Sequence, residues 1–99
     1  MELRWSREAL DRLTEIEEFI AKDNPERAAS FVDALVDHVD AILPTNPIAG
    51  RIVLELSVPD IRELLYRNYR IVYRLTGTRI DILTVFDAHR LLRSKELDR

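Results

Sequence analysis

The chain contains no cysteine and only two histidines, His38 and His89. Without cysteine it can form neither disulfide bonds nor thiolate metal sites, and two histidines are too few to build a zinc site. We therefore expect no metal ion or other cofactor. The fold must be held together by side-chain packing or by a partner.

Long apolar runs are also missing. None approaches the roughly 20 residues needed to cross a bilayer, and the opening residues MELRWSREAL lack the basic-then-apolar order of a signal peptide. We expect a cytoplasmic protein with no membrane partner. At 99 residues and 46% hydrophobic content, the chain suits a single domain over residues 1–99, because a second domain would have too little apolar surface for its own core.

Acidic and basic residues are unevenly distributed. Residues 1–49 hold 5 Lys+Arg and 11 Asp+Glu, a net charge of -6, whereas residues 50–99 hold 10 and 7, a net charge of +3, which gives -3 for the chain. Such asymmetry suits a surface that docks a charged partner. It is weak support for nucleic-acid binding, because nucleic-acid binders usually carry a much stronger basic patch.

The first half of the chain has the pattern of one strand and two helices. Residues 1–5 alternate apolar and charged side chains, as in a half-buried strand, and Ser6 can cap a helix that runs from residue 7 to about 22. Asn24 and Pro25 can cap and start a second helix that ends near Leu43. Because the linker is short, the helices should form an antiparallel hairpin. The expected apolar stripes are Leu10, Leu13, Ile16 and Ile20, then Ala28, Phe31 or Val32, Leu35, Val39 and Ile42.

The second half has the pattern of strands. The segment PTNPIAG, residues 44–50, predicts a loop, and apolar residues then recur with a period of two. Strands are expected at 51–56, 61–66, 69–75 and 79–86, and the residues after Asp87 form a last helical turn or stay loose. This order predicts an α+β fold in two layers: an N-terminal strand, then an antiparallel helical hairpin packed on one face of an antiparallel β-sheet. The other face of the sheet is expected to stay open.

Two-residue turns at 67–68 and 76–77 would fix the strand registers by counting. The face under the helices is then apolar, with the pairs Tyr66–Tyr69, Leu64–Ile71, Ile71–Ile82, Tyr73–Ile80 and Tyr69–Thr84. The opposite face carries Arg70, Val72 and Arg74, with Glu63 and Asp81 facing Val72 from either side. We expect these charges to form a cross-strand lattice on a solvated face, which favours a structural role for the arginines.

The order of elements and the segment IRELLYRNYRIVYRLTGTRIDILTVFDAHRLL resemble the RelE/ParE toxins of bacterial toxin–antitoxin systems. The resemblance covers nearly the whole chain and includes DNP at the helical bend, the PTNPIAG loop, and the final strand running into VFDAHR. It implies a toxin that arrests growth, belongs to systems associated with plasmid stabilisation, and is silenced by a small antitoxin whose C-terminal segment wraps it.

The two branches of this superfamily imply different functions. RelE-like members cut messenger RNA on the ribosome, and ParE-like members have a similar fold but poison DNA gyrase without chemistry of their own. As a nuclease, the chain would use Arg70 to contact phosphate, His89 as the catalytic histidine, and Glu63 or Glu55 as the carboxylate.

Three features argue against the nuclease. Lysine occurs only at Lys22 and Lys95, and no tyrosine follows Tyr73, so the lysines and the C-terminal tyrosine that such nucleases use are missing. The acidic net charge also opposes docking to ribosomal RNA, because neutralising phosphates is a large part of that affinity.

We therefore predict a ParE-like toxin that inhibits DNA gyrase or a related topoisomerase by binding, with a ParD-like antitoxin as its hetero-oligomeric partner. The expected contacts with the target are Arg90, Arg93 and Lys95. The expected contacts with the antitoxin are Trp5, Leu13, Ile20, Arg70 and Arg74. A ribosome-dependent mRNA endonuclease and an inactive family member remain the alternatives.

Overall fold

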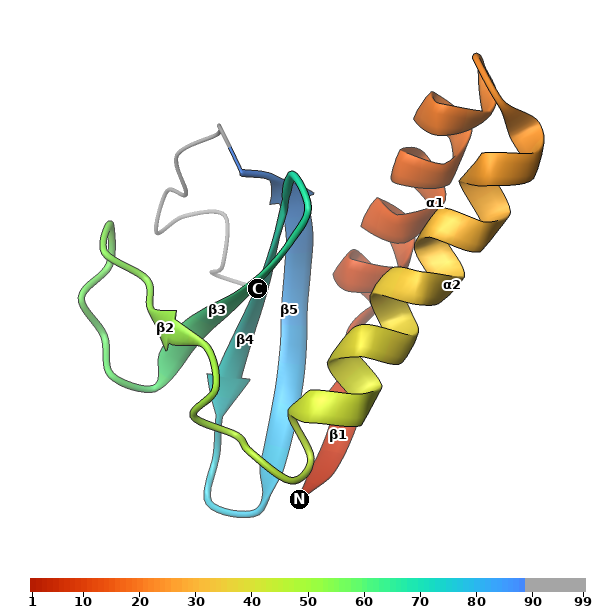
Figure 1. Cartoon of the computed structure of the whole chain (residues 1–99). Helices are drawn as coiled ribbons and strands as arrows, with labels where there is room; N and C mark the ends of the chain where they lie inside the picture. Colours follow the sequence, from red (N-terminus) through yellow and green to blue (C-terminus); the bar gives the residue numbers. More distant parts are fainter. Residues whose placement is uncertain (89–99) are drawn as a thin grey trace.

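Two α-helices pack on one face of a five-stranded β-sheet in residues 1–88, which are the residues that this computed structural model describes (Figure 1). The strand order is β1-β5-β4-β3-β2, and the predicted two-layer α+β fold is confirmed. One detail differs, because β1 pairs with β5 in parallel and only the other neighbours are antiparallel. The chain leaves β1 directly into a helix, so no hairpin turn imposes an antiparallel partner on it. In chain order the elements are β1 (Glu2–Trp5), α1 (Arg7–Ala21), α2 (Pro25–Ile42), β2 (Arg51–Ile52), β3 (Ile61–Tyr66), β4 (Tyr69–Leu75) and β5 (Arg79–Asp87).

Both helices begin at the predicted capping residues. The Ser6 hydroxyl accepts a hydrogen bond from the Ala9 N–H at 3.0 Å, and the Asn24 side chain accepts one from the Arg27 N–H at 3.1 Å. Ser6 also donates to the Leu83 carbonyl at 2.9 Å, which ties the start of α1 to β5. Within residues 1–88, neither helix is long and apolar enough to cross a membrane.

The buried stripe of α1 differs from the prediction at one position. Leu10 is 48% exposed, whereas Ala9 is fully buried beside Leu13 and Ile16. α1 packs on α2 and β5, and the small alanine side chain permits a close approach that a leucine would block. The main core between helices and sheet consists of Ala9, Leu13, Ile16, Val32, Leu35, Val39, Leu43, Ile71, Tyr73, Ile80, Ile82 and Val85.

The β3–β4 register is as predicted, with Tyr66 opposite Tyr69 and Leu64 opposite Ile71, but the β4–β5 register is not. The predicted pairs Tyr73–Ile80, Ile71–Ile82 and Tyr69–Thr84 are wrong. The observed pairs are Tyr73–Ile82, Ile71–Val85, Tyr69–Asp87 and Val72–Thr84.

Two local features explain the shift. The turn between β4 and β5 is longer than two residues, since Thr76 N–H donates to the Arg79 carbonyl at 2.9 Å. The longer turn shifts the pairing of β5 with β4 by two residues, and because side chains alternate with a period of two, Ile80 and Ile82 still face the helices. A bulge opposite the Val72–Tyr73 step then makes Leu83 the extra residue, so that Val85 instead of Thr84 faces the helices.

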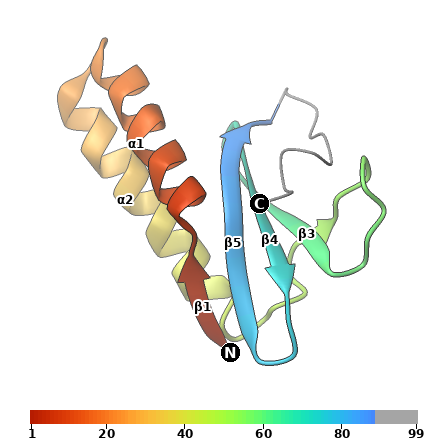
Figure 2. The same ribbon diagram turned by 180° about the vertical axis from the view of Figure 1, so that it is seen from behind.

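The far face of the sheet is partly covered. Residues 53–60, between β2 and β3, lie on the side away from the helices (Figure 1; from behind, Figure 2). A second small core forms there from Val53, Ile61, Val72 and Phe86, with Leu56 and Leu83 packed against it. The predicted strand at 51–56 is therefore wrong beyond Ile52, because the chain turns at Val53, whose carbonyl accepts from the Ser57 N–H at 2.9 Å.

Candidate functional site

The far face of the sheet carries a buried cluster of charged side chains. The Arg70 guanidinium donates through Nε to Glu63, and through Nη1 and Nη2 to the two carboxylate oxygens of Glu55 at 2.7 and 3.0 Å. The second oxygen of Glu63 accepts from Arg51 Nε at 2.8 Å. The side chains of Arg70 and Glu63 are only 6% and 2% exposed, and that of Glu55 is 21% exposed. We call these four residues the Arg70 cluster.

Adjacent strands and the covering segment bring the Arg70 cluster together. Glu63 on β3 faces Val72, two residues from Arg70 on β4, and Glu55 reaches in from the segment over the far face. The guanidinium also lies over the Phe86 ring, 5.1 Å from its centroid. The hydrogen bond with Glu55 is the main influence that raises the Arg70 pKa, with Glu63 adding to it and burial opposing it. Arg70 therefore stays charged at any physiological pH.

The predicted solvated lattice is wrong, although its acids lie on the predicted face. Asp81 faces Arg74 instead of Val72, because of the longer β4–β5 turn, and its carboxylate accepts from Arg79 Nε at 2.7 Å. Arg74 is exposed, whereas Arg70 and Glu63 are buried under the segment that covers the far face.

The structure brings together two of the three residues predicted for a nuclease. Arg70 and Glu63 are in contact, but they bind each other, and Glu55 occupies the remaining edge of the guanidinium. A phosphate could reach Arg70 only by displacing a carboxylate. His89 lies outside the described residues, as do Arg90, Arg93 and Lys95. In residues 1–88, no group of three His, Asp or Glu side chains could hold a metal ion.

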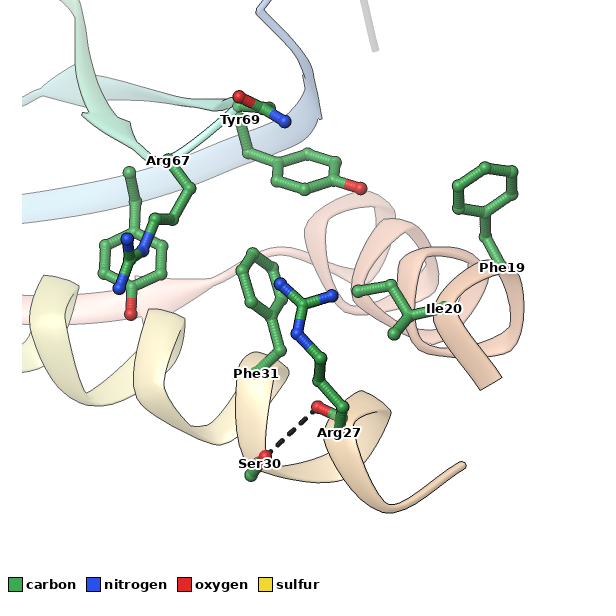
Figure 3. A pocket seen from close by; sticks show the side chains of 9 residues that line it. Phe19, Ile20, Arg27, Ser30, Phe31, Arg67 and Tyr69 are labelled. Carbon is green, nitrogen blue, oxygen red and sulfur yellow. Dashed lines mark hydrogen bonds between the residues drawn. The ribbon is translucent and has the colours of Figure 1, made fainter. Parts of the chain in front are cut away.

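A cleft lies on the other side of the molecule, between the bend of the helical hairpin and the β3–β4 turn (Figure 3). Its volume is about 600 Å³. Five apolar or aromatic side chains and two arginines, Arg27 and Arg67, line most of it; the apolar and aromatic ones are Phe19, Ile20, Phe31, Tyr66 and Tyr69. We call it the hairpin cleft.

Aromatic rings form one wall of the hairpin cleft, and each arginine lies on one of them. The Phe31 ring centroid is 5.8 Å from that of Tyr66 and 5.7 Å from that of Tyr69. Arg27 lies 5.6 Å from the Phe31 centroid, and Arg67 lies 5.9 Å from the Tyr66 centroid. Figure 3 shows Arg27 extending from α2 toward the Tyr69 ring. Burial raises the Tyr69 pKa, the Asp87 charge adds to this rise, and Arg27 opposes it.

A smaller hollow of about 310 Å³ adjoins the hairpin cleft and shares Phe19 and Tyr69 with it. It continues along α1 to Arg12 and Ile16 and along β5 to Val85. Arg12 is paired with Glu8 and Glu15 of its own helix at 3.0 and 2.9 Å. The smaller hollow is also lined by Glu15 and Asp87. The two hollows form one groove, and its arginines without a carboxylate partner in residues 1–88, Arg27 and Arg67, lie at the hairpin bend and in the β3–β4 turn.

The residues predicted to contact an antitoxin do not share one surface. Ile20 lines the hairpin cleft, whereas Arg74 is exposed on the far face. Trp5 is half-buried and donates through Nε1 to Asp40 at 3.2 Å, Leu13 is a core residue with 6% exposure, and Arg70 is 5% exposed. These contacts remain predictions.

Sequence reasoning missed Arg27, Arg67 and Phe19. Phe19 gave one available signal, because a large aromatic side chain lies off the apolar stripe of its helix and is 66% exposed. The placement of Arg27 and Arg67 around the same cleft depends on how the helical hairpin packs on the sheet. The periodicity of the sequence does not reveal this packing.

A helical hairpin packed on one face of a five-stranded, mostly antiparallel sheet is the fold expected of a toxin of the RelE/ParE type. A family model described as "ParE toxin of type II toxin-antitoxin system, parDE" matches residues 3–92. The chain belongs to this ParE toxin family of type II toxin–antitoxin systems.

Individual relatives agree with the family. Over 89 residues, 88% of each protein, the chain is 39% identical to "Putative toxin Y4kP" of Sinorhizobium fredii (strain NBRC 101917 / NGR234). A solved structure described as "Chromosomal ParDE TA system from P. aeruginosa" superposes with a TM-score of 0.73 at 32% identity, covering 88% of this chain and 95% of that one.

Proposed function

We propose that this toxin inhibits DNA gyrase, or a related type II topoisomerase, by binding it, and that a cognate antitoxin neutralises it in a hetero-oligomer. Membership of the ParE family is the observation that carries the proposal. The solved relative from P. aeruginosa is described as a ParDE toxin–antitoxin system, and this description supports the antitoxin as partner.

The geometry of the Arg70 cluster supports binding over RNA cleavage. Cleavage requires a cation near the scissile phosphate and a base near the 2′-hydroxyl. Here the guanidinium of Arg70 is held by Glu63 and Glu55, and the pair of carboxylates would repel a phosphate brought close to it. Exposing the arginine would remove its charge from the two carboxylates that bind it, one of which, Glu63, is buried, and this is costly.

Contact with the target is assigned to Arg90, Arg93 and Lys95, which make the chain basic after its last strand. The antitoxin is proposed to contact Trp5, Ile20 and Arg74, whose side chains are half-buried or exposed. The predicted contacts at Leu13 and Arg70 would require the core or the Arg70 cluster to open.

The test is a gyrase supercoiling assay with purified toxin, scoring cleaved DNA, with antitoxin added back. We expect inhibition that antitoxin relieves and that the charge reversals Arg90→Glu and Arg93→Glu weaken. Arg7→Glu is the matched control, because the Arg7 side chain is 91% exposed at the start of α1. No effect on gyrase or on topoisomerase IV from protein that still arrests growth would refute the proposal. The mRNA endonuclease would then be the favoured function, and His89→Ala should abolish RNA cleavage.

A further inference from the structure

We propose that the hairpin cleft is an anchor site for an acidic segment of the antitoxin, in which carboxylates bind Arg27 and Arg67 and a neighbouring apolar side chain inserts among Phe19, Phe31 and Tyr69. The inference rests on the proposed function for the identity of the partner. It adds a location, a chemistry and a set of residues that the family relationship alone does not supply.

The two arginines of the cleft lack the ion pairs that other arginines of this protein have. In the part of the chain that the structure describes, no carboxylate pairs with Arg27 or Arg67, whereas Arg12, Arg70 and Arg79 are each paired. Arg62 and Arg74 also lack an ion pair within residues 1–88, but neither lines the cleft, so what distinguishes Arg27 and Arg67 is that both lie at one hollow. The toxin has a net charge of -3. Two unpaired guanidinium groups around one hollow therefore form a local positive site on an acidic protein, and such a site selects an anionic ligand.

The walls of the cleft favour an anion that also carries an apolar group. The Phe31 ring packs at a tilt against both Tyr66 and Tyr69, so the aromatic wall is already formed before a partner arrives. Phe19 is 66% exposed, which leaves its ring available for burial. Aromatic and arginine side chains of this kind supply much of the energy of protein interfaces, particularly where they surround a pocket.

The backbone at Arg67 is a further sign of a binding role. Arg67 has φ of 55°, in the left-handed region that an arginine enters at a cost of about 1–2 kcal/mol. Glycine or asparagine would adopt this conformation more easily, so an arginine there suggests a use for its guanidinium. In the two-residue turn between β3 and β4, that conformation accompanies the placement of the group beside Tyr66.

A peptide segment fits the groove better than a second copy of the toxin or a nucleic acid. A symmetric contact between two clefts would bring like charges together, which opposes a dimer. The acidic net charge of the chain opposes nucleic acid, whose affinity comes mainly from neutralised phosphates. The adjoining hollow along α1 extends the site in one direction, as an extended or helical segment requires. Because Glu15 and Asp87 line that hollow, the acidic group of the segment belongs at the end of the groove that holds Arg27 and Arg67.

The experiment measures the dissociation constant of the full-length antitoxin for four toxin variants: wild type, Arg27→Glu, Arg67→Glu and the control Arg7→Glu. Each cleft reversal should weaken binding about thirtyfold or more, the effect of unpairing a desolvated charge, and Arg7→Glu should bind like wild type. Thermal unfolding of each variant checks that the fold is intact. Phe19→Ala should also weaken binding without lowering stability, because its side chain is largely exposed.

Charge exchange makes the test specific. Each acidic residue of the antitoxin is changed to arginine, and one such variant should restore tight binding to Arg67→Glu while binding wild-type toxin poorly. Cleft variants that bind antitoxin as tightly as wild type would overturn the inference and leave the proposed function standing. Failure of the wild-type toxin to bind antitoxin would overturn the proposed function itself. Cleft reversals that abolish self-association, or binding of a single-stranded DNA oligonucleotide, with antitoxin affinity unchanged, would assign the cleft to that ligand instead.

Discussion

Replacing Arg70 by methionine should lower the free energy of unfolding by about 3 kcal/mol or more, because it leaves Glu63 and Glu55 beside each other without their shared cation. Methionine keeps the length and the apolar stem of the side chain, so the change tests the charge more than the packing. We take the low end of the usual cost of breaking a buried ion pair, about 3–5 kcal/mol, because Glu55 is 21% exposed and Glu63 retains Arg51.

Arg74→Met is the matched control for this prediction. Arg74 is four residues further along the same strand and on the same face, but it is exposed, so its replacement should change stability by less than about 0.5 kcal/mol. For a domain of this size, a loss of 3 kcal/mol corresponds to a fall in Tm of about 12–24 °C. Urea unfolding followed by circular dichroism measures both variants directly.

The double variant Arg70→Met/Glu63→Leu completes a cycle. Removing both charges should recover part of the loss, because the buried Glu63 carboxylate, which loses the Arg70 cation in the single variant, is then absent as well. A loss below about 1 kcal/mol for Arg70→Met alone, equal to that of Arg74→Met, would show that Arg70 behaves as a surface arginine. Arg70 would then be free to bind a phosphate. Toxicity assays of Arg70 variants need this stability measurement beside them, because loss of fold also abolishes toxicity.

Three further predictions concern single contacts that hold the loop, the hairpin and the sheet together. Gly50→Ala should lower the free energy of unfolding, measured in urea, by about 1–3 kcal/mol, because a Cβ there would lie 2.5 Å from the Glu63 carbonyl oxygen and 2.6 Å from the Tyr73 hydroxyl. Gly77→Ala is the control and should cost nothing, because no atom lies within 4 Å of its Cβ. Tyr73→Phe should cost about 1–3 kcal/mol at pH 8, since the Tyr73 hydroxyl accepts from the Gly50 N–H at 2.9 Å and donates to the Pro47 carbonyl at 2.8 Å. Burial raises the Tyr73 pKa above its ordinary 10.0, and the unfolded tyrosine therefore ionises first. The wild type should consequently lose stability as the pH rises above 10, and the Tyr73→Phe variant should lose less in thermal melts. Equal losses of stability in the two proteins would contradict this. Ser6→Ala should cost about 0.5–2 kcal/mol through loss of the helix cap, together with its hydrogen bond to Leu83, and a cost near zero in urea unfolding would show that neither bond contributes.

Local features of the sequence were enough to predict most of the elements. The caps at Ser6 and Asn24, the two helices and the β3–β4 pairing are as predicted, because each depends on residues close together in the chain. The β4–β5 register failed at two points that the pattern does not encode, the turn after Leu75 and the bulge at Leu83. Counting from a two-residue turn and an unbroken strand therefore gives the wrong partners.

The candidate sites were less accessible from the sequence. Arg70 and Glu63 were correctly assigned to the face away from the helices, but their burial depends on Glu55, which arrives from a segment predicted as a strand. Alternating charge is compatible with either a solvated face or a covered one, and only the course of the covering segment distinguishes them.

The sequence by itself determined the α+β class, the order of the elements, the apolar face under the helices and the resemblance to toxins of the ParE type, since all of these follow from local periodicity and short motifs. The tertiary structure alone decided that Arg70 is enclosed by Glu63 and Glu55, and that Arg27 and Arg67 meet around an aromatic cleft. Residues 27 and 67 are far apart in the chain, and only the packing of the helical hairpin against the end of the sheet brings them together. Burial and pairing of charges depend on such long-range contacts, and these properties separate a structural arginine from one that can bind a partner.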